Sequence, residues 1–369
     1  MKNFFLSLLN FIRYAKLKNK KENYIFYSES KFYREHFADL IDNFIKSQEN
    51  NIIFVTSDYD DHIYHQKKIT SFYIAEGLIL HLFFQYLKCK YMIMTLTDLG
   101  NHLKKSKNCK NYVYFFHSQS STHEQYTSEA FINYDIVFTI GNYQKRELIE
   151  AEKKFGYPPK KIINTGYFFF DHILKKVNFN KKKNDHILFA PSWNYNKNFF
   201  DDYGLEVIKK LIENNFFVTL RPHPEHHKRS KKTLSKIINS LKKNSNFSID
   251  YEYSNLHSLE KSELLITDNS SIDMEYVLIF KRPVIHIDYV KKIHNFSSNK
   301  ISLDTIENHF KNEFGNKIHI NQMNELVSLC NKLVNNQDNI DQKVRSFTDQ
   351  YFSNLGTSSQ FAAKYLLSN

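Results

Sequence analysis

Residues 264–276 read LLITDNSSIDMEY, and this stretch decides the fold class that the sequence predicts. Residues 264–267 are apolar or β-branched, which is typical of a buried strand, and a helical pattern follows Ser271. A strand that leads through a short polar turn into a helix is the repeating unit of parallel sheets covered by helices. The turn also places Ser270 and Ser271 at the cap and first turn of that helix, where backbone N–H groups lack helical partners.

The same alternation of strands and helices extends outward through most of the chain. Strands are expected at residues 24–27, 52–56, 91–96, 112–116, 136–140, 162–164, 187–190, 217–220, 247–249, 264–267 and 284–287. Helical patterns are found at residues 32–47, at 143–154 and from 322 to 367, and a polar, lysine-rich stretch at 175–184 is typical of an interdomain connection. The pattern predicts an α/β fold with two Rossmann-like, doubly wound domains facing each other across a cleft, at residues 23–175 and 176–369.

The composition is that of a globular protein. Of the 369 residues, 41% are hydrophobic, which is enough to form the cores of two domains. The net charge of +12 favours anionic partners such as lipid head groups, nucleotides or nucleic acid. The three cysteines lie far apart in the sequence without CxxC spacing, so neither a disulfide framework nor a thiolate metal site is predicted, and a reducing cytoplasm fits best.

Residues 1–22 are predicted to form an amphipathic N-terminal segment. Apolar residues at positions 4, 8, 11, 12 and 15 recur at helical spacing, and basic residues follow from position 13 to position 21. Such a helix could lie in a membrane interface with its basic side chains against anionic lipid, or it could pack on the protein's own surface. The sequence has no apolar run of 18 residues, so a membrane-spanning helix is not expected.

The serine turn at residues 268–271 is the first candidate site. The sequence has neither GxGxxG nor GxxxxGK[ST], so a phosphate must be held by helix N-termini and side chains. The free N–H groups near Ser270 and Ser271 are suited to a pyrophosphate, and Glu275 lies one turn further on, where it could accept hydrogen bonds from ribose hydroxyls. The alternative is ordinary helix capping.

A second candidate site follows the strand expected at residues 217–220. Residues 221–224 read RPHP, and ligands of open α/β sheets bind beyond the carboxyl ends of strands. The prolines hold the backbone around His223, Arg221 could fork onto phosphate oxygens, and His223 could donate a hydrogen bond to one. The alternative is a turn with a surface histidine.

A third candidate site lies in the first half, where the strand at residues 112–116 ends in His117 and Ser118, with His123 close behind. A histidine at a strand end is a candidate general base because its ordinary pKa lies near the working pH, although loop histidines are often structural. The histidines and carboxylates do not show metal-ligand spacing and HExxH is absent, so no metal site is predicted.

Together these motifs resemble those of the CDP-glycerol glycerophosphotransferase family, whose members prime or polymerise teichoic-acid-like and capsule-like polymers. The resemblance covers the chain from about residue 112 to residue 293. The segments that carry it are FHS (116–118), YD (134–135), Gly141, NTGY (164–167) with Asp171, LFAPSW (188–193), RPHP (221–224), TDNSS (267–271) and KRPVI (281–285). The last three, in this order and at suitable spacing, are specific together although each alone is weak.

The resemblance implies a GT-B architecture in which the C-terminal domain holds most of the donor nucleotide and the N-terminal domain lies on the acceptor side. It implies that His117 is the base that deprotonates the acceptor hydroxyl and that His223 contacts the donor phosphates. Donor-binding residues are then Arg221, Asp268, Ser270, Ser271 and Glu275, and acceptor or cleft residues are Ser118, His123 and Ser192.

Two departures from the family pattern concern the pockets. Better-known members carry Trp-His-Gly where this chain has Phe116, His117 and Ser118, and many carry an aromatic residue where this chain has Asn269. These departures leave the shape of the acceptor and donor pockets, and the group transferred, open.

The expected reaction moves glycerol phosphate, or a related phosphopolyol, from a CDP-activated donor to a hydroxyl of a cell-surface polysaccharide or teichoic-acid-like acceptor. The hydroxyl attacks the outer phosphorus and CMP leaves, with no metal and no cofactor besides the donor. The enzyme is expected in the cytoplasm, bound peripherally to the anionic inner face of the membrane, and nucleic acid is not an expected partner. The alternatives are a GT-B glycosyltransferase that uses a nucleotide-sugar, a sugar-nucleotide 2-epimerase and a non-catalytic scaffold.

Overall fold

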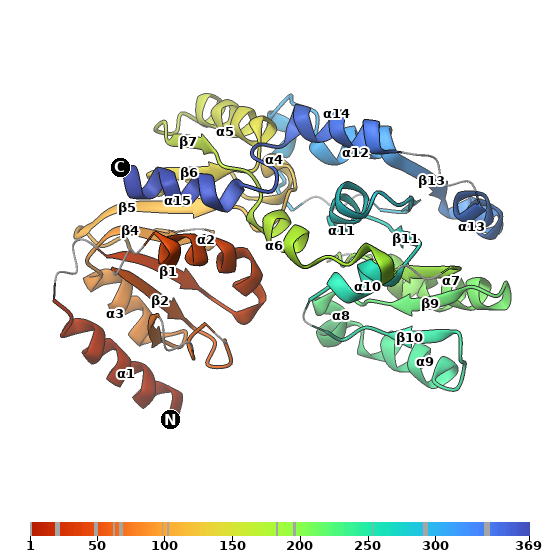
Figure 1. The fold of residues 1–369 in the computed structure, drawn as a ribbon, viewed down its shortest axis with the longest axis horizontal. Helices are drawn as coiled ribbons and strands as arrows, with labels where there is room; N and C mark the ends of the chain where they lie inside the picture. The colour runs from red at the N-terminus through yellow and green to blue at the C-terminus, as the bar shows by residue number, and fades with distance from the viewer. Residues whose placement is uncertain are drawn as a thin grey trace. The chain divides into compact units, whose positions relative to one another are not determined.

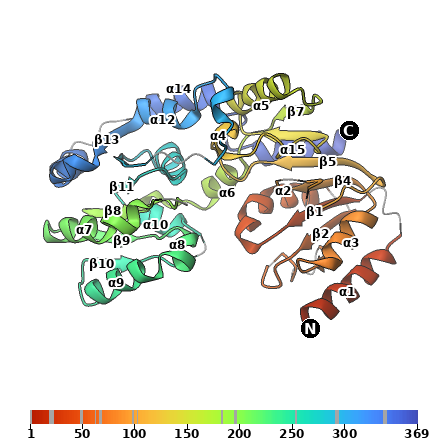
Figure 2. The same cartoon turned by 180° about the vertical axis from the view of Figure 1, so that it is seen from behind.

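The chain forms two compact units. The computed structural model describes residues 2–18, 23–47, 51–61, 63–65, 69–97, 99–101, 103–181, 184–194, 197–252, 254–290, 294–335 and 340–369. Unit 1 consists of Met1–His172, His294–Leu303 and Tyr351–Asn369, and unit 2 consists of Ile173–Ile293 and Asp304–Gln350. Figures 1 and 2 show their helices and strands from two sides.

Unit 1 is built on a parallel sheet. Over the described residues its seven strands follow the order β3-β2-β1-β4-β5-β6-β7. The strands are β1 (Tyr24–Ser28), β2 (Ile52–Thr56), β3 (Thr70–Tyr73), β4 (Cys89–Met94), β5 (Cys109–Phe115), β6 (Ile136–Thr139) and β7 (Lys161–Asn164). The strand order reverses between β1 and β4, as it does in a doubly wound sheet.

Helices cover both faces of this sheet, because successive side chains of a strand point to opposite faces. Phe26 of β1 packs edge-on against Phe37 and Phe44 of α2 (Arg34–Lys46). The next residue, Tyr27, packs against Phe84 of α3 (Leu78–Tyr86). The other helices of unit 1 are α1 (Lys2–Ala15), α4 (Thr122–Gln125), α5 (Asn142–Phe155) and α15 (Ser358–Ser368), and α6 (Phe168–Lys176) leads into unit 2.

Unit 2 repeats the doubly wound pattern. Over the described residues its six strands follow the order β10-β9-β8-β11-β12-β13. The strands are β8 (His186–Phe189), β9 (Phe217–Leu220), β10 (Phe247–Ile249), β11 (Leu264–Thr267), β12 (Val284–Asp288) and β13 (Gly315–His319). The helices are α7 (Phe199–Glu213), α8 (Pro224–Arg229), α9 (Lys231–Leu241), α10 (Leu256–Lys261), α11 (Ile272–Glu275), α12 (Ile306–Phe314), α13 (Leu326–Asn335) and α14 (Asp341–Tyr351). The predicted α/β class with two Rossmann-like domains is confirmed.

The sequence pattern did not predict two of the strands, β3 and β13, and both lie at sheet edges. β3 reads TSFY with only its last two residues buried, and β13 reads GNKIH with only Ile318 buried. An edge strand has one neighbour and partly exposed faces, so it needs fewer apolar residues than a central strand. The eleven strands that the pattern did predict are all present, with ends shifted by three residues or fewer.

The chain does not divide between the units as the sequence suggested. Residues 351–369 were expected in the C-terminal domain, but they belong to unit 1, as do residues 294–303. Buried Asp171 accepts hydrogen bonds from the backbone N–H and the hydroxyl of Ser359 at the start of α15, both at 2.7 Å. At Gly141 an added Cβ would lie 1.7 Å from the carbonyl oxygen of Tyr351, so only glycine permits this close approach.

Two of the cysteines lie side by side in the fold, although they are far apart in the sequence. Cys89 and Cys109 are register partners on β4 and β5, and their sulfur atoms lie 3.2 Å apart as free thiols. Distance along the sequence therefore said nothing about their distance in the fold. Burial raises the pKa of the Cys89 thiol well above its ordinary value.

Two features are absent from the described residues, a membrane span and a metal-binding cluster. None of the helices in these ranges is long and apolar enough to cross a membrane. Within the same ranges, no group of three or more His, Cys, Asp and Glu side chains is placed to hold a metal ion.

Candidate functional site

Three motifs of unit 2 follow neighbouring strand ends. RPHP follows β9, Ser192 lies three residues beyond β8, and Asp268 directly follows β11. Since β9, β8 and β11 are adjacent and parallel, their carboxyl ends meet at one edge of the sheet. The strand order reverses between β8 and β11, and open α/β sheets bind ligands at such a switch point.

A buried hydrogen-bonded pair joins the strand ends at this switch point. The carboxylate of Asp268 accepts from the backbone N–H of Ser192 at 2.6 Å and from its hydroxyl at 2.8 Å. Both residues are almost fully buried. Asp268 and Ser192 thus fix two loops of the site to each other.

His226 extends this cluster, and the sequence analysis gave it no role. Its Nε2 lies 3.0 Å from the carbonyl oxygen of Ser192, and its Nδ1 lies 3.0 Å from the hydroxyl of Ser230. The hydroxyl of Ser230 donates to Asp201. Burial lowers the pKa of His226. The sequence feature that could have drawn attention to His226 is its position in the first turn of the helix that begins at Pro224. Spacing alone could not reveal its hydrogen-bond partners.

His223 caps helix α8, and this contact fixes its tautomer. Its Nδ1 accepts a hydrogen bond from the backbone N–H of Glu225 at 3.2 Å, and Pro224 occupies the first helical position. A neutral imidazole that accepts at Nδ1 carries its proton at Nε2. His223 is half-buried at the strand end with a donor on Nε2.

Arg221 has a different environment from the one expected of a phosphate ligand. Its guanidinium lies 2.6 Å from the carboxylate of Asp250, which follows β10, and also donates to the carbonyl oxygen of Ser254 at 3.4 Å. The charge of Arg221 is therefore balanced inside unit 2. In the structure Arg221 links the ends of β9 and β10, and its role as a phosphate ligand stays a prediction.

The serine motif opens a helix as predicted. Ser271 is the N-cap residue of α11, which continues as the π-helix η4 (Tyr276–Phe280), and the Ser270 and Ser271 side chains are half-buried. The buried carboxylate of Asp273 in α11 lies 2.8 Å from Nε2 of His286 in β12. This pair fixes the first turn of the helix to the sheet.

Glu275 is buried behind the serine turn. Its carboxylate accepts a hydrogen bond from the side-chain amide of Asn255 at 2.8 Å. Asn255 is the N-cap residue of α10. Glu275 thus contacts the start of a neighbouring helix in unit 2.

In unit 1, His117 lies two residues beyond β5 among aromatic side chains. Its ring centroid is 4.8 Å from that of Tyr33 and 6.1 Å from that of His36. Burial lowers the pKa of His117 to about 4, so the ring is neutral at pH 7. Its Nδ1 is buried and has no hydrogen-bond partner among the described residues.

The sequence analysis missed Tyr33, which contacts His117, and Glu29, whose charge acts on Tyr33. Burial and the neighbouring Glu76 raise the pKa of Glu29 to about 7. Burial and the charge of Glu29 raise the pKa of Tyr33 to about 12. Glu29 directly follows β1, so the rule that ligands bind beyond strand ends could have drawn attention to it.

Ser118 and His123 differ in their surroundings. Ser118 is half-buried, and its hydroxyl is hydrogen-bonded to that of Ser120 at 2.9 Å. His123 is buried with its Nδ1 3.5 Å from a carboxylate oxygen of Glu147, and its carbonyl oxygen accepts from Asn295. These contacts indicate that His123 holds α4 and α5 together, and they give no sign of a place on an open surface.

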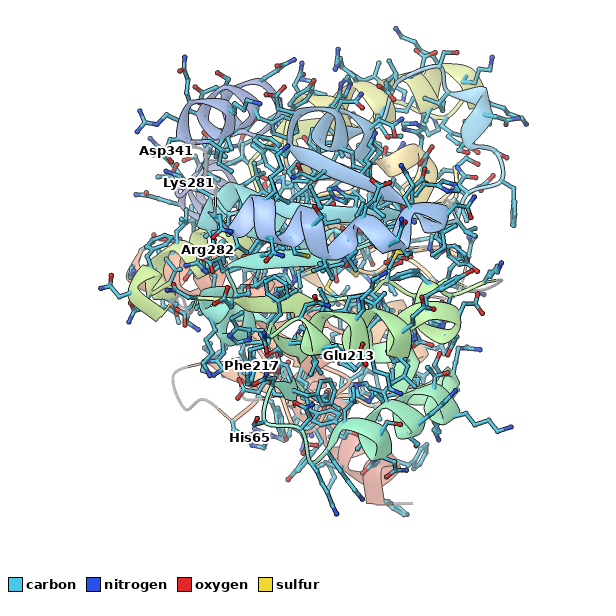
Figure 3. All side chains as sticks on the ribbon, turned by 90° about the vertical axis from the view of Figure 1, so that its right-hand side faces the viewer. His65, Glu213, Phe217, Lys281, Arg282 and Asp341 are labelled. Carbon is cyan, nitrogen blue, oxygen red and sulfur yellow. The ribbon has the colours of Figure 1, made fainter. Side chains whose placement is uncertain are left out.

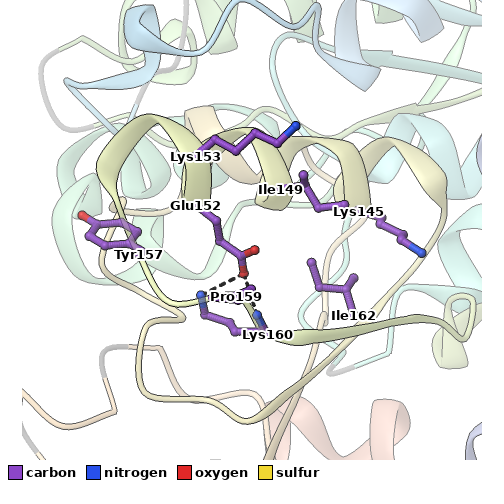
Figure 4. Close-up of a pocket in the computed structure, with 8 residues that line it drawn as sticks. All are labelled: Lys145, Ile149, Glu152, Lys153, Tyr157, Pro159, Lys160 and Ile162. Carbon is purple, nitrogen blue, oxygen red and sulfur yellow. Dashed lines mark hydrogen bonds and ion pairs between the residues drawn. The ribbon is translucent and has the colours of Figure 1, made fainter.

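A pocket of about 490 Å³ lies beside the edge strand β7 of the unit 1 sheet. Figure 4 shows it between α5 and the start of β7, with Lys145 and Lys153 beside it. Glu152 accepts from both the backbone N–H and the ammonium of Lys160 at 3.1 Å. Its lining residues do not include His117, Ser118 or His123, so this pocket is separate from the site around His117.

Sequence comparison identifies the family. The chain matches the family described as CDP-Glycerol:Poly(glycerophosphate) glycerophosphotransferase over residues 8–360. The chain belongs to this family. It is therefore an enzyme of the CDP-glycerol glycerophosphotransferase type. A search of curated proteins gave no match.

Solved structures with the same fold support a GT-B-type architecture for this glycerophosphotransferase. The wall teichoic acid polymerase TagF matches with a TM-score of 0.60 and 17% identity, covering 100% of this chain and 98% of that chain. UDP-GlcNAc 2-epimerase from Methanocaldococcus jannaschii, in complex with UDP-GlcNAc and UDP, matches with a TM-score of 0.61 and 17% identity, covering 94% and 99%. At these identities the likeness shows the fold alone.

The structure of this glycerophosphotransferase brings together part of the predicted site. In unit 2, the motifs that contain Ser192, His223 and Asp268 meet at one sheet edge, and Ser192 and Asp268 are directly bonded. In unit 1, His117 and Ser118 follow a strand end. His226, Glu29 and Tyr33 were missed because their significance comes from contacts between segments far apart in the sequence.

Proposed function

We propose that this enzyme transfers glycerol phosphate, or a related phosphopolyol, from a CDP-activated donor to a hydroxyl of a cell-surface polysaccharide or teichoic-acid-like polymer, with release of CMP. The observation that carries the proposal is the family match over residues 8–360. The meeting of three motifs at the switch point of the unit 2 sheet supports it, because a nucleotide-binding sheet holds its ligand there.

Unit 2 would bind the donor. The N–H groups that follow Ser270 and Ser271 favour an anion because they point along the start of a helix. The Nε2 proton of His223 would donate to a phosphate oxygen. Asp268 and Ser192 would act indirectly by keeping both loops in place.

Unit 1 would activate the acceptor. The neutral ring of His117 can accept the proton of an acceptor hydroxyl, and its unpartnered Nδ1 would gain from a hydrogen bond to substrate. As the proton leaves, the hydroxyl oxygen forms a bond to the outer phosphorus, and the bond from that phosphorus to the bridging oxygen breaks. CMP departs with the electron pair of the broken bond. The proposed reaction uses no cofactor besides the donor.

The outer face of α1 supports a peripheral place on the membrane. Phe5 is 60% exposed, Leu9 is 59% exposed and Ile12 is 42% exposed, and they share one face of the helix. The face toward the protein instead carries Ser7, which accepts from the N–H of Ala75, and Tyr14. Leu6, Leu8 and Phe11 are half-buried, so only part of the apolar surface of α1 faces outward, and we propose that this outward part contacts anionic lipid at the cytoplasmic side.

A donor panel tests the proposed reaction. Purified enzyme would be incubated with CDP-glycerol, CDP-ribitol, UDP-GlcNAc and a hydroxyl-bearing polymer acceptor, and the released nucleotide would be identified by chromatography. We expect CMP from a CDP-alcohol, and we expect His223→Gln to lower its release. A nucleoside diphosphate released from the nucleotide-sugar would instead establish a glycosyltransferase and overturn the proposal.

A further inference from the structure

The reaction proposed above requires a positive charge near the donor phosphates. Two phosphates of the donor would lie at the serine turn, and a group transfer that adds charge to the leaving phosphate needs a cation close by. Arg221 was the expected cation, but its guanidinium is already paired with Asp250. Another basic side chain of unit 2 should therefore face the serine turn.

Lys311 reaches this turn from helix α12. Its ammonium donates to the side-chain oxygen of Asn269 at 3.0 Å, and Asn269 directly precedes Ser270. Asn269 is itself held by a hydrogen bond from its amide to the carbonyl oxygen of Val290 at 2.8 Å. Helical side chains lean toward the helix N-terminus, and α12 runs from the carboxyl edge of the sheet to the start of the parallel strand β13, so Lys311 leans toward the strand ends.

The partner of Lys311 is a neutral amide, so its charge is not balanced. Lys311 is half-buried and makes no ion pair among the described residues. A half-buried ammonium that has no carboxylate beside it among the described residues can take a bound anion as its counter-charge. The position of Asn269 is also where the sequence departs from the aromatic residue common in the family.

Two other basic residues of the same unit, Arg282 and Lys281, are already paired. The buried guanidinium of Arg282 donates to the carbonyl oxygens of Leu259, Glu260 and Ser262 at 3.1, 2.8 and 2.5 Å. Lys281 lies 2.6 Å from the carboxylate of Asp341. Figure 3 labels Lys281, Arg282 and Asp341, which lie close together in that view.

Lys197 also lies near the strand ends, but its surroundings differ. Its ammonium lies 4.8 Å from the ring centre of Tyr289, and the hydroxyl of Tyr289 donates to Asp202. An aromatic ring and a nearby carboxylate thus already face the charge of Lys197. Lys311 is the better placed of the two, since its direct contact is with the residue next to the serine pair.

We infer that Lys311 is a donor-binding residue that contacts the diphosphate of the nucleotide at the serine turn. In this arrangement Asn269 orients the ammonium of Lys311, and the diphosphate supplies the negative charge that balances it. Lys311 would hold the phosphate that departs with cytidine and balance the charge that develops on it. This inference rests on the proposed function, because that function places a diphosphate at the turn.

Titration calorimetry with CDP, UDP and inorganic pyrophosphate tests the inference on the whole chain. Lys311→Met keeps the length of the side chain and removes the charge, and Lys311→Arg keeps the charge. Lys317→Met is the matched control, since Lys317 also donates to an asparagine side chain, Asn312, but is exposed on the edge strand β13. Thermal unfolding of each variant would verify that it is folded.

We expect Lys311→Met to weaken CDP binding by roughly 10- to 100-fold, the effect of losing one charge-assisted hydrogen bond. Lys311→Arg should recover most of the affinity, and Lys317→Met should bind as the unaltered protein does. Folded Lys311→Met that binds CDP within twofold of the unaltered protein would overturn the inference and leave the proposed donor standing. An equal loss in Lys317→Met would also overturn it, because the effect would then be one of overall charge.

The outcomes for the two proposals are separable. If the unaltered protein binds UDP and not CDP, the CDP donor is wrong, and the same variants titrated with UDP then decide the role of Lys311. If the unaltered protein binds neither nucleotide nor pyrophosphate, the diphosphate site is absent and both proposals fail.

Discussion

Two histidines follow strand ends in this protein, and their hydrogen bonds give them different chemistry. His223 accepts at Nδ1 from the backbone of helix α8, so it presents a proton at Nε2. His117 is surrounded by rings, and burial lowers its pKa to about 4. The first is therefore suited to donating to a phosphate, and the second to accepting a proton from a hydroxyl.

Substitution of His117 tests its role as a base. We expect His117→Asn to lower kcat by roughly 100- to 10,000-fold, the range for the loss of a general base. Affinity for CDP should not change, because the proposed donor residues belong to unit 2. The measurement is CMP release under saturating donor, with His81→Asn, an exposed histidine of α3 in the same unit, as the control. Near-normal turnover by folded His117→Asn would remove His117 from the mechanism.

The lowered pKa of His117 also predicts a pH profile. In the folded protein the ring takes up a proton only as the pH falls toward 4, instead of near its ordinary value of 6.5. The base is therefore fully available above about pH 5, and kcat/KM should fall only below that pH. An acidic limb centred near pH 6.5 in the unaltered enzyme, and absent in His117→Asn, would contradict the burial effect.

At the scale of a helix, α1 is oriented by a few polar contacts. The hydroxyl of Tyr14 donates to the carbonyl oxygen of Lys88 at 3.0 Å and accepts from its N–H at 3.1 Å. Arg13 lies with its guanidinium 5.6 Å from the ring centre of Phe72. These contacts turn Phe5 and Leu9 outward. The sequence pattern alone was compatible with either orientation.

Vesicle binding tests the outward face of α1. We expect Phe5→Ser combined with Leu9→Ser to weaken cosedimentation with vesicles containing phosphatidylglycerol by at least tenfold, because each exposed side chain contributes about 1.5 to 3 kcal/mol when buried in lipid. Leu355→Ser is the control, since Leu355 is also an exposed apolar residue of unit 1. Equal binding of the double variant and the control would show that α1 does not contact the membrane.

At the scale of the whole chain, unit 1 depends on residues from both ends of the sequence. Ala362, Ala363 and Leu366 of α15 belong to the same core as β1 and α2. Figure 1 shows α15 beside α2, although more than 300 residues separate them. Because the C-terminal segment completes this core, unit 1 cannot finish folding until the end of the chain is available.

The contact between Asp171 and Ser359 measures this dependence. Asp171→Ala would leave the buried N–H and hydroxyl of Ser359 without their acceptor, and we expect a loss of about 2 to 4 kcal/mol in the free energy of unfolding. The measurement is chemical denaturation monitored by far-ultraviolet circular dichroism. Ser359→Ala, which removes the hydroxyl and keeps the N–H, should cost about half as much. A similar loss in both variants would show that the backbone contact contributes little.

The candidate site was predictable where one segment carries all of its information. The serine turn after β11 and the histidine after β9 follow from strand, turn and helix patterns that span about ten residues each. The ion pair of Arg221 with Asp250 was not predictable, because the two residues are 29 positions apart and meet only when β9 and β10 pair. For the same reason, the contact of Lys311 with Asn269 could not be read from either segment.

The sequence by itself determined the fold class, the family motifs and most strands, because apolar periodicity and turn residues act over short distances. Only the tertiary structure decided which charges are balanced, which side of α1 faces outward and which unit holds the C-terminal helix. Those properties arise from pairs such as Asp268 with Ser192 and Asp171 with Ser359, whose members are separated by 76 and 188 residues. Burial and hydrogen bonding depend on what the fold brings together, and no local pattern records that.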